Sequence, residues 1–150
     1  MSTREERIAG IPRAREILEL AANGNEYALE YLCEMDHLER VLDDFIDGDH
    51  EVVKEDMLKA IRWLAITCYG NKFFMANLYT LATLHGVVMS AWEESNKMEH
   101  GSDTERIYHH VLKEGFVQII TAVALMTGGY ALMREVESKV WPFIMRPMEG

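Results

Sequence analysis

The distribution of proline constrains this chain more than any other feature of its sequence. The prolines are Pro12, Pro142 and Pro147, so none interrupts the chain between Pro12 and Pro142. A proline inside a helix removes a backbone hydrogen bond and clashes with the preceding turn, so this spacing favours long helices. No run of alternating apolar and polar residues indicates a β-strand. The sequence therefore predicts an all-α fold.

Residues that start and end helices divide the chain into segments with short connections. Asn23-Gly24, Gly48, Gly70 and Gly101-Ser102 are typical of helix ends or interhelical turns, and Asn25 is a favourable N-cap. They delimit six expected helices, over residues 12 or 13 to 22, 25–47, 49 or 50 to 69, 71–98, 103–127 and 130–140. Gly128-Gly129 is expected either to kink the fifth helix or to end it. Because the connections are short, consecutive helices should pack antiparallel.

The length of 150 residues is usual for a single domain. We therefore predict one domain over residues 1–150, an antiparallel bundle of five to six helices. Residues 1–11 form a charged N-terminal lead-in in this interpretation, and residues 142–150 form a C-terminal tail.

Two segments lack the charged side that a surface helix normally has. Phe73–Trp92 and Gly115–Met133 contain no Asp, Glu, Lys or Arg. Each is about long enough to cross a bilayer, but polar residues such as Asn77 and Gln118 favour buried bundle helices instead. We expect central apolar helices at about 71–98 and 103–127, and no membrane association. One short chain has little capacity to cover both, which predicts a homo-oligomer, most often a two-fold dimer.

The charge of the chain bears on its partners. Asp and Glu number 25 against 15 Lys and Arg, a formal net charge of −10. Such acidity disfavours direct nucleic-acid binding and anionic membranes, and it is compatible with a basic protein partner. Cys33 and Cys68 stand among apolar neighbours and form no disulfide framework, and Met1–Arg7 shows no apolar signal segment. A cytoplasmic location is the simplest interpretation.

Three residues are the candidates for a buried polar site. His85 lies at the centre of the apolar face expected for the helix over 71–98, where its ring nitrogens need partners. Glu105 and His109 are four residues apart, so they share one face of the next helix, at the edge of its apolar side. We predict that these three residues are the first place to look for a site.

A row of carboxylates offers a different chemistry. Asp36, Glu39 and Asp43 follow one another at three- and four-residue steps, and hard carboxylate oxygens suit Mg²⁺. With His85 or His109 as the proton-transfer group, they would fit a small metal-dependent hydrolase acting on a nucleotide or phosphoester. This alternative requires the carboxylates to converge around a concave pocket. It is the only interpretation that implies a cofactor, a divalent metal.

No complete catalytic motif is present. Glu34 and His37 have the E-x-x-H spacing of di-metal bundle proteins, but no second such motif accompanies them. The leading interpretation is a non-enzymatic acidic helical protein that acts by binding, as an inhibitor, adaptor or regulator and as a homo-oligomer. The hydrolase is the alternative, and a small-molecule pocket around Asn77, Tyr79 and His85 is a third.

Overall fold

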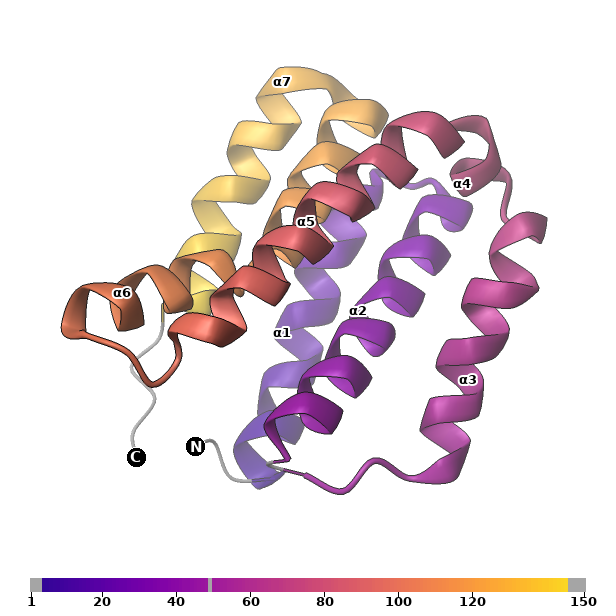
Figure 1. Ribbon diagram of the computed structural model, residues 1–150. Helices are drawn as coiled ribbons and strands as arrows, with labels where there is room; N and C mark the ends of the chain where they lie inside the picture. The colour runs from indigo at the N-terminus through magenta and orange to yellow at the C-terminus, as the bar shows by residue number, and fades with distance from the viewer. Residues whose placement is uncertain (1–3, 49, 146–150) are drawn as a thin grey trace.

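The computed structural model describes residues 4–48 and 50–145, which form helices and no strand. In chain order the elements are α1 (Arg4–Ala22), α2 (Glu26–Asp47), α3 (Lys54–Ala65), the 3₁₀ helix η1 (Thr67–Gly70), α4 (Lys72–Ala76), α5 (Leu78–Met98), α6 (Asp103–Leu112) and α7 (Phe116–Ile144). The predicted all-α helical bundle is confirmed (Figure 1).

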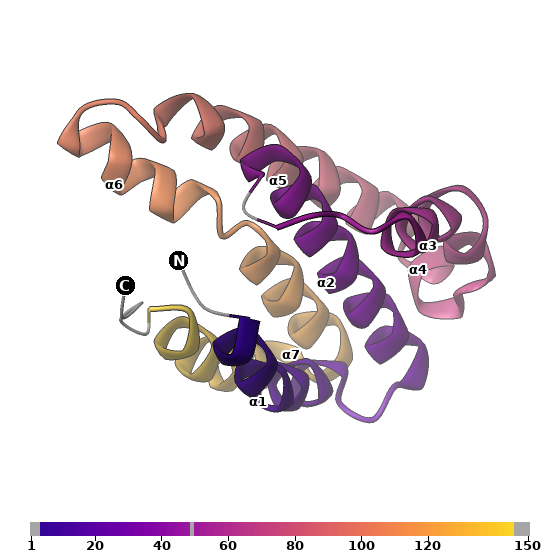
Figure 2. The same ribbon diagram turned by 90° about the horizontal axis from the view of Figure 1, so that it is seen from below.

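The bundle is built in layers around α2. Seen from below, α1 and the second half of α7 lie on one side, α5 and α6 lie on the other, and α2 lies between them (Figure 2). In Figure 1, α5 crosses in front of the other helices and α3 stands beside α2. The largest fully buried hydrophobic side chains come from α2, α5 and α7 and define the core: Tyr31, Leu32, Leu81, Val117, Val123, Val136 and Val140.

The helix α1 begins earlier than expected. It runs from Arg4, through Pro12, to Ala22, so the predicted lead-in over residues 1–11 is helical from Arg4 onward. At the other end of the chain, α7 continues through Pro142 to Ile144, into the predicted tail. The remainder of that tail, residues 146–150, lies outside the described residues.

The segment expected as one helix over 71–98 is two helices. Asn71 caps α4 by accepting a hydrogen bond from the Phe74 N–H at 2.8 Å. Asn77 then separates α4 from α5, and its side-chain amide donates to the Phe73 carbonyl at 2.9 Å. Within the single chain α5 is not enclosed, because only Leu81 and Ser95 among its residues are buried. The apolar helix predicted at the centre thus lies at the outside of the bundle.

The segment expected as one helix over 103–127 is also broken. α6 ends at Leu112 and α7 begins at Phe116. Gly115 lies in the break, packed so closely on α5 that a Cβ atom there would stand 2.6 Å from Val88 Cγ1. The close approach of this turn to α5 therefore requires glycine.

Gly129 reverses the direction of α7. Its backbone angles, φ 82° and ψ −174°, belong to a region that only glycine adopts readily. Residues 116–128 form a first arm and residues 130–144 a second arm that runs back beside it (Figure 1). The C-terminal end of α1 holds the reversal, since Thr127 Oγ1 donates to the Ala21 carbonyl at 2.7 Å and Asn23 Nδ2 donates to the Thr127 carbonyl at 3.0 Å.

The same reversal limits what the apolar C-terminal region can span. The segment Asp103–Ile144 includes a stretch that is long and apolar enough, by length and composition, to cross a membrane. The first arm, residues 116–128, is ~20 Å long and the second arm, residues 130–144, ~22 Å at 1.5 Å per residue. Each is shorter than the ~30 Å hydrocarbon layer, so this geometry fits a helical hairpin of the bundle better than a membrane span.

Candidate functional site

His85 joins an aromatic cluster between α2, α4 and α5. Its Nε2 lies 2.5 Å from the hydroxyl of Tyr31, a fully buried residue of α2. The imidazole stacks on the Tyr31 ring at 5.9 Å and on the Phe74 ring at 6.1 Å between centroids, and Trp63 packs against the same tyrosine. The polar atoms of this pair satisfy each other inside an apolar surrounding, which is the behaviour of a core histidine.

Burial sets the protonation of the pair. It lowers the pKa of His85, because desolvation disfavours the imidazolium, and it raises the pKa of Tyr31, because desolvation disfavours the phenolate. Both groups are therefore neutral at neutral pH. His85 is half-buried, and its contacts with Tyr31 and Phe74 hold α5 against α2 and α4.

His109 occupies a different part of the molecule. It is buried on α6, and its Nδ1 lies 2.7 Å from the carbonyl oxygen of Ser95, near the end of α5. This bond holds α6 against α5. Ser95 follows His85 by ten residues on the same helix, which places the two histidine sites roughly 15 Å apart.

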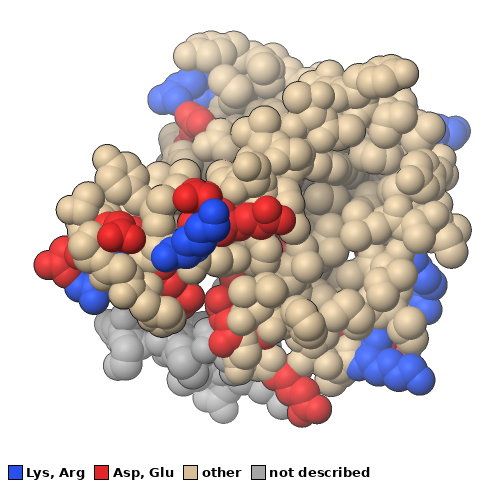
Figure 3. Space-filling model, in the orientation of Figure 1, with Lys and Arg blue, Asp and Glu red and all other residues tan. Residues whose placement is uncertain are grey.

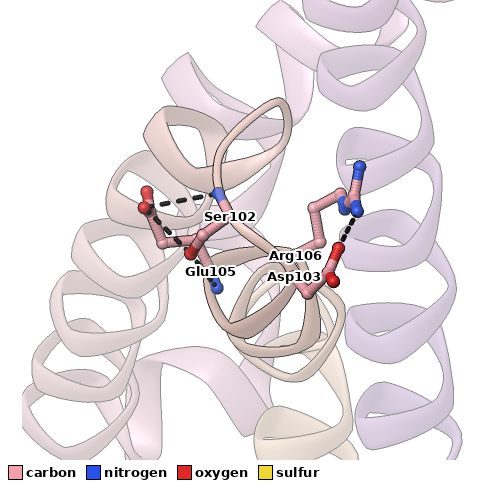
Figure 4. Close-up of polar contacts among 4 residues, drawn as sticks. All are labelled: Ser102, Asp103, Glu105 and Arg106. Carbon is pink, nitrogen blue, oxygen red and sulfur yellow. Dashed lines mark hydrogen bonds and ion pairs between the residues drawn. The ribbon is translucent and has the colours of Figure 1, made fainter.

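Glu105 acts at the start of α6 (Figure 4). The Ser102 hydroxyl accepts from the Glu105 N–H at 3.2 Å, and the Glu105 carboxylate accepts from the Ser102 N–H at 3.4 Å. This reciprocal pair is a capping box, and it satisfies two backbone donors that the helix cannot pair. An ion pair between Asp103 and Arg106 stands beside it. The three predicted site residues thus serve three separate structural contacts and do not share a cavity.

The predicted carboxylate row gathers with one further acidic residue. Asp36 forms an ion pair with Arg40 at 2.8 Å. The negative charges of Asp36, Glu114 and Asp43 all act on the Glu39 carboxyl group. Burial, followed by these neighbouring charges, raises the pKa of Glu39 to about 8. Glu114 joins from the turn between α6 and α7, a contribution that the sequence alone did not indicate because it depends on the α6–α7 break.

Asp43 shows the same effect one turn further along α2. Burial, followed by the negative charge of Asp47 and a hydrogen bond with it, raises the pKa of Asp43 to about 6. The raised pKa values of Glu39 and Asp43 thus come from burial and from the neighbouring carboxylates. In the described part of the chain, no three His, Cys, Asp or Glu side chains are placed to hold a metal ion. The carboxylates of Asp36, Asp43 and Glu114 are near enough to act on Glu39, but they do not form such a metal-holding group.

Glu34 and His37 tie α2 to α3. Glu34 lies 4.0 Å from the ammonium of Lys59, and His37 Nε2 lies 3.0 Å from the carbonyl oxygen of Asp56. The E-x-x-H spacing is therefore used for contacts between helices.

Tyr79 points away from the interior pocket considered from the sequence. Its side chain is 89% exposed, whereas His85 packs against Tyr31 and Phe74. Asn77 lines a separate open hollow of about 400 Å³ near the start of α2. The three residues do not surround one pocket.

The most unusual surface of the molecule is the outer side of α5. From Phe73 to Trp92 the chain has no charged residue, and on the outer side Tyr79 is 89% and Val87 64% exposed. In Figure 3 uncharged atoms cover the part of the surface over α5, Lys and Arg side chains stand along the edge at α3, and acidic residues gather around α6 and the C-terminal end of α5. We call the exposed residues 79–90 of α5 the α5 face. Large exposed apolar patches on a folded protein mark interaction sites, and Tyr79, Val87 and Met89 are the large hydrophobic residues exposed on α5.

A shallow groove runs along this face. It has a volume of about 630 Å³ and lies between α5 and Leu112 of α6. Its α5 lining consists mostly of small or apolar side chains: Thr83, Gly86, Val87, Ser90 and Ala91, with Glu94 completing it. The groove was not predicted from the sequence, because its second wall depends on how α6 folds back on α5.

Comparisons with known protein families, curated proteins and solved structures give no match to this chain.

Proposed function

We propose that this protein acts by binding, as a non-enzymatic inhibitor, adaptor or regulator, and that it works as a homo-oligomer in the cytoplasm. The observation that carries the proposal is the uncovered α5 face, on which Tyr79 and Val87 are exposed and no residue is charged. Leaving such apolar surface in water is unfavourable by about 25 cal/mol per Å², so covering it drives association.

The acidic surface supports a second contact, to a basic protein. The net charge of −10 repels nucleic-acid backbones and anionic lipids, and it attracts a positively charged surface. Because exposed charges more than about 10 Å apart are screened by salt, the affinity for such a partner falls steeply as ionic strength rises. Retention of a partner without loss at 1 M salt would count against this contact.

The site geometry gives less support to the alternative hydrolase. The candidate proton-transfer groups, His85 and His109, are each held by a structural hydrogen bond, to Tyr31 and to the Ser95 carbonyl. The carboxylates around Glu39 form no group placed to hold a metal ion among the described residues. We therefore propose no second function.

Two measurements on the purified protein test the proposal. Sedimentation velocity over a concentration series should show the mass rising from the 17.3 kDa of one chain as concentration increases. Incubation with Mg²⁺ and bis(p-nitrophenyl) phosphate should give no turnover. A particle that stays at 17.3 kDa up to several hundred micromolar would overturn the homo-oligomer, and turnover lost in a Glu39→Gln variant would overturn the non-enzymatic function.

A further inference from the structure

The α5 face carries both a protruding side chain and a groove, which makes it complementary to a copy of itself. Building on the proposed function, we infer that the α5 helices of two chains pack antiparallel about a two-fold axis near Thr83. The Tyr79 side chain of each copy then enters the groove of the other. The partner of this face is a second copy of the same chain.

The positions of the side chain and the groove define the axis. A helix turns 100° per residue, so Tyr79, Thr83, Gly86 and Ser90 lie on one side of α5. Tyr79 precedes Thr83 by four residues, and Val87, within the groove lining, follows it by four. A two-fold axis through Thr83 perpendicular to the helix exchanges these two positions. It therefore brings each Tyr79 opposite the groove of the other copy and forms the contact twice.

The pairing of two α5 helices explains why residue 86 is a glycine, whereas the packing within one chain does not. Glycine inside a helix destabilises it by about 1 kcal/mol relative to alanine. A Cβ atom added at Gly86 would meet nothing within 4 Å, so no neighbour in the chain requires the absence of a side chain. Close approach of another helix is a common reason for a glycine at such a position. Gly86 lines the groove, where the other copy's tyrosine would lie.

The charges favour a second copy in this orientation. Two chains of net charge −10 repel each other. Because the α5 face has no charged residue, pairing through this face brings no like charges of the face together. Glu93 and Glu94 stand near the C-terminal end of α5, and Lys72 precedes its N-terminal end. Antiparallel packing directs the acidic end of each helix toward the other's N-terminal end, where the helix dipole is positive.

The size of the face sets the expected strength. α5 is 21 residues long, ~30 Å, and a strip of one helix with its groove walls covers on the order of 500 Å² per copy. This is near the lower limit for specific interfaces. We expect a reversible dimer with a dissociation constant of about 1–50 µM.

Sedimentation velocity of three variants tests the inference. Tyr79→Ser removes the protruding ring, and Gly86→Leu fills the groove that receives the other copy's Tyr79, with open space for the new side chain within its own chain. Each should raise the concentration of half-association at least tenfold. Tyr130→Ser is the matched control, because Tyr130 is also an exposed tyrosine but lies on α7 next to its reversal. It should change that concentration less than twofold.

The outcomes separate the inference from the proposed function. If the native chain associates but Tyr79→Ser and Gly86→Leu leave association unchanged, the α5 pairing is overturned and a homo-oligomer through another surface remains. If the native chain does not associate at all, both the pairing and the homo-oligomer are overturned. Circular dichroism melts of each variant should match the native curve within a few degrees, which confirms that lost association is not lost folding.

Discussion

At the scale of single residues, polar groups inside this bundle pair with one another across long stretches of sequence. Tyr31 and His85 are 54 positions apart, and the ring of each covers the other. A buried polar atom without a partner destabilises the folded state by about 1–3 kcal/mol, so such pairs specify which helices pack together.

The Tyr31–His85 pair gives the first prediction. Tyr31→Phe keeps the ring and removes the hydroxyl that lies 2.5 Å from His85 Nε2. The free energy of unfolding should fall by about 1–2 kcal/mol, measured by urea denaturation at one protein concentration. Tyr27→Phe is the control, since Tyr27 is half-buried on the same helix and its ring faces Lys72. A loss equal to that of the control would contradict a structural role for the bond.

Glu39 gives a prediction about pH. Its pKa is raised from 4.5 to about 8, so between these values the folded state binds more protons than the unfolded state. The free energy of unfolding contributed by this group therefore falls as pH rises from about 4.5 to 8 and is constant above that range. Glu39→Gln removes this dependence and should be more stable than the native protein at pH 8, by on the order of 2 kcal/mol.

Urea denaturation at pH 5 and pH 8 measures the Glu39 effect. The difference between native and Glu39→Gln proteins should be small at pH 5 and large at pH 8. Glu16→Gln is the control, because Glu16 is an exposed carboxylate on α1. A Glu39→Gln variant less stable than the native protein at pH 8 would show that the carboxylate has a stabilising partner there.

At the scale of elements, local signals predicted most helix ends and missed the breaks. Asn25 caps α2 as expected, accepting from the Tyr27 and Ala28 N–H groups at 3.0 Å, and Gly48 ends the helix with φ 68°. The breaks at Asn77 and at residues 113–115 were not predicted. A glycine is needed at position 115 because the chain there lies against Val88. This contact is between residues distant in sequence, so no local sequence pattern predicts it.

Gly129 gives a prediction at this scale. Its φ of 82° and ψ of −174° are strained for any residue with a Cβ atom. Gly129→Ala should therefore lower the free energy of unfolding by about 1–3 kcal/mol, measured by urea denaturation. Gly70→Ala should change it by less than about 1 kcal/mol, because Gly70 has open space and no left-handed φ. Equal small effects would contradict a reversal fixed by Gly129.

At the scale of the whole molecule, the sequence left two interpretations of its uncharged helix: a bundle centre or the seam of an oligomer. The missing charges of Phe73–Trp92 are visible in the sequence, but which side of the helix other helices cover depends on the packing of the whole chain. The structure leaves Tyr79 and Val87 exposed, which supports the second interpretation. His85, Glu105 and His109 were the candidates for a buried polar site, with only Glu105 and His109 placed on one helix face by local spacing, and the structure places all three in separate contacts.

The pairing of two α5 helices near Thr83 is tested most directly by a cysteine at that position. A residue on a two-fold axis faces its own copy, and packed helices at axial distances of about 8–10 Å bring such residues within disulfide range. Thr83→Cys should therefore form a covalent dimer, twice 17.3 kDa, under mild oxidation. Ser138→Cys, exposed on α7, and the native chain with Cys33 and Cys68 are the controls and should remain monomers on denaturing gels. Failure of Thr83→Cys to cross-link, or equal cross-linking of Ser138→Cys, would contradict the α5 pairing.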